Sequence, residues 1–325
     1  MRRLIAVVVA LFALALVGSP LALAQEATPA TEGVGLPPGV AFTPLAQAVV
    51  AELPPAPADV FFARFTFESG ATFPLDPTDP SLALVAVESG TMTFRAVTDV
   101  RVTRVAVAGT PVAGEVAVGG VETQLGPGDS ALFPPFVAGE IRNAGAVPVV
   151  LLAAVIEPVG AANAATPTAA TPGTEGTPLA DEGALVGLSF QGLAFGQADQ
   201  LPAGPAAMGI GRLILEPGAS IPAHPHPGPE FGVVEAGTAS LTVSEGQVEI
   251  IRGITTATPG PEAPETEMVG AGEEVTLQAG DGVFYHPGTV ADFRNEGDNP
   301  LVLLGGGVEP LTGDMATSMA ATPAT

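Results

Sequence analysis

The sequence contains no cysteine, no lysine and no tryptophan, and its only tyrosine is Tyr285. Without cysteine there is no disulfide framework, no thiolate metal site and no thiol nucleophile, and without lysine there is no Schiff-base chemistry. A lipoprotein anchor is excluded too, because the chain has no cysteine that a lipid could modify. Any metal site must therefore use histidine and carboxylate side chains.

Positive charge is also scarce, with 10 basic residues against 34 acidic ones. Arg2 and Arg3 lie at the extreme N-terminus, so the rest of the chain holds eight arginines and a net charge of −26. Such a surface repels phosphate backbones and anionic lipid headgroups. We therefore expect no nucleic-acid partner and no electrostatic docking to a membrane.

The N-terminus has the pattern of a secretory signal peptide. Arg2 and Arg3 precede an apolar run from Leu4 to Val17, a Gly-Ser-Pro break follows, and Ala22-Leu23-Ala24 forms a small-x-small cleavage site. We predict a signal peptide over residues 1–24, cleaved near Ala24, and a secreted protein, extracellular or periplasmic, with no membrane contact after cleavage. The alternative is a retained membrane anchor, because residues 4–24 are almost long enough to span a bilayer.

The remainder of the chain contains an internal duplication. Leu53–Thr78 aligns without a gap on Leu201–His226, and Gly128–Leu152 aligns on Gly280–Leu304. The tract of alanine, threonine and proline between the repeats is typical of an extended linker. We predict a disordered segment over residues 25–44, a first domain over 45–158, a linker over 159–182, a second domain over 183–311 and a disordered tail over 312–325.

Both repeats favour β structure. Short apolar or alternating runs, such as Phe61–Phe67 and Phe231–Val234, are separated every eight to twelve residues by glycine and proline. This spacing is typical of an antiparallel sandwich or barrel. The one candidate for a helix is Leu45–Leu53.

The second repeat carries a motif with a specific spacing. The stretch PGASIPAHPHPGPEFGVVEAG places Gly218, His224, His226, Glu230 and Gly237 at fixed intervals. This pattern resembles the first motif of the cupin family, and the glycines and asparagine of the second cupin motif match Gly280, Gly288 and Asn295. The resemblance implies an all-β fold of two tandem cupin jelly-roll (double-stranded β-helix) barrels, joined by the Thr/Pro/Ala-rich linker and packed as an intramolecular pseudo-dimer.

The motif also implies a metal site. Residues two apart on a strand share a face, so His224 and His226 can project into one cavity, and Glu230 keeps the same parity. Two imidazoles and a carboxylate suit a divalent transition metal such as Mn, Fe, Zn, Ni or Co, in the second barrel only. The alternative is a relic motif, in which the histidines form hydrogen bonds within the cavity and bind nothing.

The site departs from the family at one ligand. The resemblance places a further histidine at position 291, which is Ala291. The chain's third histidine, His286, stands where the family has proline. It is a candidate fourth ligand if its strand faces differently from the family's, and otherwise a residue of the rim or surface.

The first repeat lacks the ligands altogether. Asp76, Thr78 and Gly139 replace the three histidines, and the glutamate position falls on Leu82 or Ala83. We expect this barrel to be structural, or to bind an organic ligand without a metal. Two arginine positions are common to both repeats, Arg64/Arg212 and Arg142/Arg294. They are expected to form ion pairs or hydrogen bonds between strands or barrels, with binding of a substrate carboxylate as the alternative.

Three functions remain open at this stage. The first is a binding protein that holds a divalent metal, a small molecule or both in the second barrel. The second is a metal-dependent cupin enzyme resembling a dioxygenase or decarboxylase, and the third is a structural extracellular protein. The sequence indicates no substrate and does not decide whether the protein is an enzyme.

Overall fold

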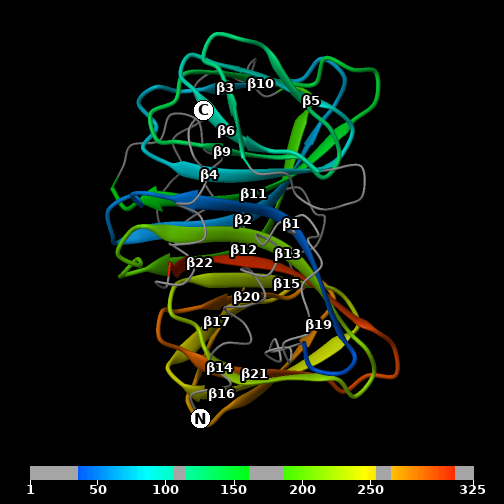
Figure 1. Ribbon diagram of the computed structural model, residues 1–325. Coiled ribbons are helices and arrows are strands. Elements are labelled where there is room, and N and C mark those ends of the chain that lie inside the picture. The colour runs from blue at the N-terminus through cyan, green and yellow to red at the C-terminus, as the bar shows by residue number, and fades with distance from the viewer. Residues whose placement is uncertain (1–35, 106–113, 161–185, 254–264, 312–325) are drawn as a thin grey trace, which may run out of the picture.

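The computed structural model describes residues 36–105, 114–160, 186–253 and 265–311. These residues form an all-β protein of twenty-two strands, in two seven-stranded and two four-stranded sheets (Figure 1). No helix in these ranges is long and apolar enough to cross a membrane. The predicted signal peptide and C-terminal tail, and almost all of the linker, lie outside the described residues. The all-β fold of two barrels is as the sequence predicts.

The first barrel encloses one apolar core between a seven-stranded and a four-stranded sheet. The larger sheet has the order β12 (Leu188–Ala198), β2 (Ala58–Phe67), β11 (Val149–Pro158), β4 (Leu82–Ser89), β9 (Ser130–Phe133), β6 (Val100–Thr103) and β7 (Glu115–Ala117). The smaller has the order β3 (Thr72–Leu75), β10 (Gly139–Arg142), β5 (Met92–Ala96) and β8 (Thr123–Leu125). Neighbouring strands within these two sheets are antiparallel.

The second barrel repeats this plan around its own core. Its larger sheet has the order β1 (Val40–Val50), β13 (Ala206–Leu215), β22 (Leu301–Pro310), β15 (Glu230–Ala236), β20 (Gly282–Tyr285), β17 (Gln247–Ile251) and β18 (Thr266–Gly270). Its smaller sheet has the order β14 (Ser220–Pro225), β21 (Val290–Asn295), β16 (Thr238–Glu245) and β19 (Glu274–Gln278). The duplication in the sequence is therefore a duplication of the fold.

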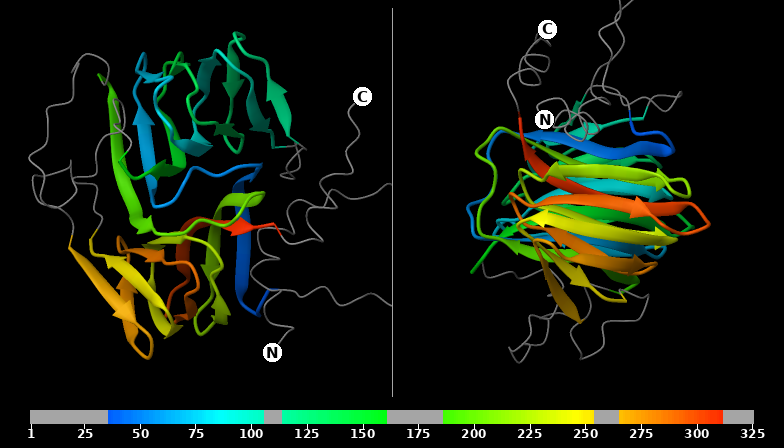
Figure 2. Two further views of the ribbon diagram at one scale, coloured as in Figure 1. Left: turned by 90° about the vertical axis from the view of Figure 1, so that its left-hand side faces the viewer. Right: turned by 90° about the horizontal axis from the view of Figure 1, so that it is seen from below.

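The two barrels exchange their first strands. Strand β1 of the first repeat pairs with β13 of the second, and β12 of the second pairs with β2 of the first. Figure 2 (left) shows β1 running along the lower barrel and β12 along the upper one. The sheets thus cross the boundaries drawn from the sequence, and residues 40–44 belong to a strand, not to a disordered segment. The candidate helix over Leu45–Leu53 is not formed, because most of this segment lies in β1.

A third apolar core lies between the barrels and joins them. It is built from the outer faces of the two larger sheets, with Phe62 and Leu152 from one repeat and Ile210, Phe231 and Phe284 from the other. The aromatic rings of Phe62 and Phe231 stack with their centroids 4.7 Å apart. With the exchanged strands, this shared core makes the pseudo-dimer one packed unit.

A network of four charged residues also bridges the barrels. Arg64 contacts Glu88 at 2.6 Å and Glu235 at 2.7 Å, while Arg212 contacts Glu235 at 2.8 Å and Glu88 at 3.2 Å. Each arginine therefore pairs with the acid of its own repeat and with that of the other. This confirms the expectation that the duplicated Arg64 and Arg212 form ion pairs between barrels.

The second duplicated pair of arginines has a more local role. Arg142 pairs with Glu122 and lies 3.9 Å from Glu140, and Arg294 lies 3.5 Å from Asp292 and from Glu296. These contacts are on the surface, where an ion pair stabilises a protein by about 0–1 kcal/mol.

The duplicated asparagines Asn143 and Asn295 fix one turn in each barrel. The side-chain amide of Asn295 donates hydrogen bonds to the carbonyls of Leu215 and Asn299, and its oxygen accepts one from the amide of Gly297. Asn143 makes the same three bonds with Phe67, Val147 and Gly145. Both asparagines are buried, so the asparagine of the motif has a structural role here.

We expect Asn295→Ala to lower the free energy of unfolding by about 2–4 kcal/mol, because each buried polar group left without a partner costs about 1–3 kcal/mol. Urea denaturation followed by circular dichroism measures this. Asn299→Ala is the matched control, since the exposed Asn299 serves through its backbone carbonyl. A change below about 0.5 kcal/mol for Asn295→Ala, as for a neutral surface site, would refute the role assigned to this side chain.

Candidate functional site

The two histidines of the motif are positioned by β14 and the residues after it. His224 pairs directly with Ala291 on β21, and the register of β14 shifts between Ile221 and His224. This bulge brings His224 to the same face as the buried Ile221 despite their odd spacing. His226 follows the strand, with its backbone amide bonded to the carbonyl of Thr289 at 2.8 Å.

Glu230 begins β15 and lies in the middle of the larger sheet. It pairs with Tyr285 on β20 and with Gly307 on β22. A Cβ atom at position 307 would lie 2.4 Å from Cγ of Glu230, so Gly307 leaves the space that the glutamate side chain needs. Glu230 and His226 are 9% and 4% exposed, so both polar groups are buried.

These side chains converge in one part of the second barrel. Nδ1 of His226 lies 3.0 Å from Oε1 of Glu230. The ring of His226 stacks on Tyr285 with a centroid distance of 4.1 Å and lies 4.6 Å from the ring of His224. The structure therefore places His226 next to both Glu230 and His224.

Several of the buried polar atoms have no hydrogen-bond partner. Both ring nitrogens of His226 and Oε1 of Glu230 lack a hydrogen bond. Nδ1 of His226 and Oε1 of Glu230 are close to each other, but their angle does not suit a hydrogen bond. Buried polar groups in folded proteins are nearly always hydrogen-bonded, so such a cluster needs an explanation. Two ligand atoms about 2.1 Å from one metal ion, at a right angle to each other, are about 3.0 Å apart. The donors of His226 and Glu230 have this separation.

A complete set of three ligands is not assembled. Among residues 36–105, 114–160, 186–253 and 265–311, no three His, Cys, Asp or Glu side chains are grouped as ligands of one ion. His224 directs Nδ1 to the carbonyl oxygen of Pro222, 2.9 Å away. Burial, and then the proximity of His226, lower the pKa of His224, which favours its neutral form.

His286 lies apart from this group. Its ring packs edge-on against Phe284, with centroids 5.1 Å apart, whereas Tyr285 between them points toward His226. Alternate residues of a strand face opposite sides, so His286 shares the face of Phe284, which belongs to the core between the barrels. The structure therefore does not support His286 as a fourth ligand.

Two further residues lie near Glu230 and were not predicted as site residues from the sequence, namely Tyr285 and Glu309. Burial and the charge of Glu230 raise the pKa of Tyr285 well above its ordinary value. Glu309 is buried on β22, two residues beyond Gly307 and on the same face, and burial together with Glu230 raises its pKa to about 8. The sequence could have indicated Glu309, because the second aligned block of the duplication extends to it: Glu157-Pro158 in the first repeat matches Glu309-Pro310 in the second.

The corresponding positions of the first barrel offer few donors. Oδ1 of Asp76 accepts hydrogen bonds from the amide and the hydroxyl of Thr78. Gly139 has φ 153°, and a Cβ there would lie 2.1 Å from the carbonyl oxygen of Arg95. A histidine therefore does not fit at position 139, and Leu82 is part of the apolar core.

Comparison with known proteins supports the resemblance. The family model described as "Cupin domain" matches residues 211–260, which include His224, His226 and Glu230. No curated protein matches. The cupin resemblance is confirmed by this match, which lies in the second repeat.

Solved structures with a similar arrangement have low sequence identity to the chain. AerE from Microcystis aeruginosa is 12% identical, with 82% of this chain and 98% of that chain covered and a TM-score of 0.39. Oxalate decarboxylase from Bacillus subtilis at pH 4.6 is 15% identical, with 86% and 78% covered and a TM-score of 0.34. A putative glyoxylate-induced protein from Pseudomonas aeruginosa is 14% identical, with 89% and 92% covered and a TM-score of 0.36.

Proposed function

We propose that this protein of two cupin barrels is an exported binding protein that holds one divalent transition metal in its second barrel. The ligands are His224, His226 and Glu230. The observation that carries the proposal is the buried contact of His226 with Glu230, whose facing atoms lie 3.0 Å apart without a proper hydrogen bond. A cation between them would satisfy both groups at once.

The donor set fits such an ion. Imidazole and carboxylate together are typical ligands of Mn, Fe, Zn, Ni and Co. His226 and Glu230 already lie side by side, and His224, with Nδ1 held by Pro222, retains Nε2 as a donor. Because the pKa of His224 is lowered, its ring is neutral at neutral pH and can donate a lone pair. When bound, the ion would act as a Lewis acid with open coordination positions.

An alternative function is catalysis by the same centre, in the manner of a metal-dependent dioxygenase or decarboxylase. Glu309 favours it, because a carboxyl group with a pKa of about 8 is protonated at neutral pH and faces Glu230. Such a group can transfer a proton. We place binding first because Ala291 stands where the family's further ligand belongs, so the ion would be held by three side chains. A purely structural role ranks third, since it leaves the buried atoms of His226 and Glu230 unexplained.

The test is a titration of the metal-free protein with Zn²⁺ and, separately, with Mn²⁺, by isothermal calorimetry. We expect one site per chain, and we expect His226→Ala and Glu230→Gln each to weaken binding at least about 100-fold, because a three-ligand site has no spare donor. Melting temperatures of the variants show whether the barrel remains folded.

The control is Asp76→Asn, which changes the equivalent position of the first barrel and should leave binding unchanged. A wild-type protein that binds neither ion would contradict the proposal. So would equal binding by wild type and His226→Ala, because the metal would then lie on the acidic surface.

A further inference from the structure

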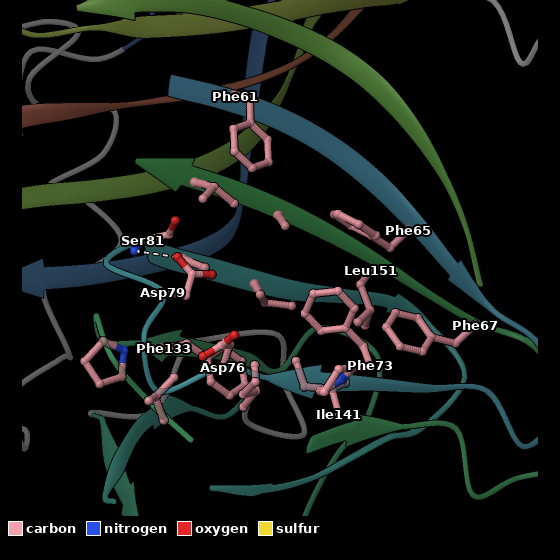
Figure 3. Close-up of a pocket in the computed structure, with 18 residues that line it drawn as sticks. Phe61, Phe65, Phe67, Phe73, Asp76, Asp79, Ser81, Phe133, Ile141 and Leu151 are labelled. Atoms are coloured by element: carbon pink, nitrogen blue, oxygen red, sulfur yellow. Dashed lines mark hydrogen bonds between the residues drawn. The ribbon is translucent and has the colours of Figure 1, made fainter. Parts of the chain in front are cut away.

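The first barrel contains a partly open cavity of about 110 Å³. Five phenylalanines line it, Phe61, Phe65 and Phe67 from β2, Phe73 from β3 and Phe133 from β9. Aliphatic residues of β4, β10 and β11 complete the wall. Figure 3 shows the phenyl rings gathered around this space between the strands of the barrel. The interior is therefore almost wholly apolar and strongly aromatic.

The cavity has a polar side formed by the segment between β3 and β4. Asp76, Asp79 and Ser81 line it there, and Figure 3 shows both carboxylates well separated from Phe65 and Phe67. Oδ1 of Asp79 accepts a hydrogen bond from the amide of Ser81, and the hydroxyl of Ser81 is buried without a partner. This side thus presents carboxylate oxygens and a hydroxyl to whatever enters.

No cation within the described residues balances these carboxylates. None of the ion pairs involves Asp76 or Asp79, and the chain contains no lysine. Burial, and then the negative charges of Asp79 and Asp59, raise the pKa of the nearby Glu157 to about 7. The polar side of the cavity therefore favours a positively charged partner.

The position of this polar side matches that of the candidate metal site. Asp76 and Thr78 align with His224 and His226 in the duplicated sequence, so each barrel carries its polar residues at the same place. In the second barrel these residues are the proposed metal donors, and in the first they are a carboxylate and a hydroxyl. The two copies have the same fold but different chemistry for a ligand.

We propose that the first barrel binds a small amphipathic amine in its protonated form. One aromatic ring or short alkyl chain occupies the phenylalanine cavity, and the ammonium group is held by Asp79 and Asp76. The size limits the apolar part of the ligand to one ring or a short alkyl chain, because an apolar protein cavity of about 150 Å³ accommodates benzene and this partly open cavity has about 110 Å³. Charge-assisted hydrogen bonds to the carboxylates favour an ammonium group here.

The test compares three probes of one size and different charge by isothermal calorimetry at about 0.15 M salt, where long-range attraction is screened. The probes are 2-phenylethylamine, 2-phenylethanol and phenylacetate. We expect the amine to bind at least about tenfold more tightly than the alcohol, and phenylacetate not to bind, because it would face two carboxylates.

Two variants separate the parts of the site. Asp79→Asn should weaken binding of the amine at least about tenfold and leave the alcohol unchanged, since it removes the charge and keeps the shape. Phe73→Ala should weaken binding of both. Glu216→Gln is the matched control, because it removes one exposed carboxylate from the second barrel and should change neither affinity.

Three results would overturn the inference. These are no binding of the amine, equal affinity for the amine and phenylacetate, and equal loss of amine affinity in Glu216→Gln and Asp79→Asn. The metal titration of the second barrel is independent of all three. A protein that binds Zn²⁺ through His226 but no amine would contradict only the inference about the first barrel.

Discussion

Replacing Phe231 by alanine is expected to lower the free energy of unfolding by about 3–5 kcal/mol, the usual cost of removing a buried aromatic ring. Phe231 is 3% exposed and stacks on Phe62 of the other repeat, in the core between the barrels. Removing its ring leaves a cavity lined by both large sheets. Since each barrel also contains a strand of the other repeat, we expect both barrels to unfold in a single transition. Urea denaturation followed by circular dichroism measures the midpoint and the number of transitions.

Phe136→Ala is the matched control, because Phe136 is 60% exposed and its loss should change the stability little. The interpretation of the shared core fails if Phe231→Ala costs less than about 1 kcal/mol, as at an average site. It fails equally if the barrels melt in two separate steps and Phe231→Ala shifts only one of them. In that case the exchanged strands would not couple the barrels.

The strand exchange is the part of the fold that the sequence did not reveal. The duplication predicted two equal barrels, but equal barrels offer equal edges to β1 and β12. Strand β1 pairs with β13 and β12 with β2, and these are equivalent strands of the two repeats. A first strand that fits its own barrel therefore fits the other almost as well. Which barrel each first strand joins depends on the connecting chain and on packing between the sheets. Neither can be predicted from a local sequence pattern.

The error over Leu45–Leu53 has a related cause. This segment is rich in alanine and leucine, which favour helices in isolation. In the structure, residues 40–50 instead hydrogen-bond along nearly the whole length of β13, with Val40 opposite Leu215 and Val50 opposite Ala206. Tertiary pairing overrides a weak local preference of this kind. The sheet edge offered by the other repeat therefore determined the structure here.

The candidate site was more predictable, because its residues are close in sequence. The spacing of the motif places His226 beside Glu230 and beside the ring of His224, whereas the bulge in β14 that sets the face of His224 is seen only in the structure. Whether His286 is a ligand stayed open in the sequence, because the second motif does not show which of the residues at the end of β20 face inward. The pairing of Glu230 with Tyr285 decides this, and it is visible only in the structure.

Ala291→His is expected to strengthen metal binding by the second barrel about 100-fold, by adding an imidazole ligand. Ala291 lies directly opposite His224 in the antiparallel pair of β14 and β21, so their side chains project to the same face. It is 1% exposed and packs in the barrel core. The larger side chain should therefore cost about 1–3 kcal/mol of stability through overpacking. Calorimetric titration with Zn²⁺ and Mn²⁺ measures the gain, and urea denaturation measures the cost.

Ala291→Leu separates the two effects, because it adds comparable bulk without a donor atom. It should lower the stability in the same way and leave the metal affinity at or below that of the wild type. Equal metal affinities of Ala291→His and Ala291→Leu would show that the side chain at position 291 does not face the ligands. The arrangement proposed for a metal site at His224, His226 and Glu230 would then be wrong. If the wild type binds no metal and Ala291→His does, the barrel retains the geometry of a metal site but lacks the donor that completes it. The buried contact of His226 with Glu230 would then be the remnant of that site, and metal binding and metal-dependent catalysis would both be excluded for the natural protein.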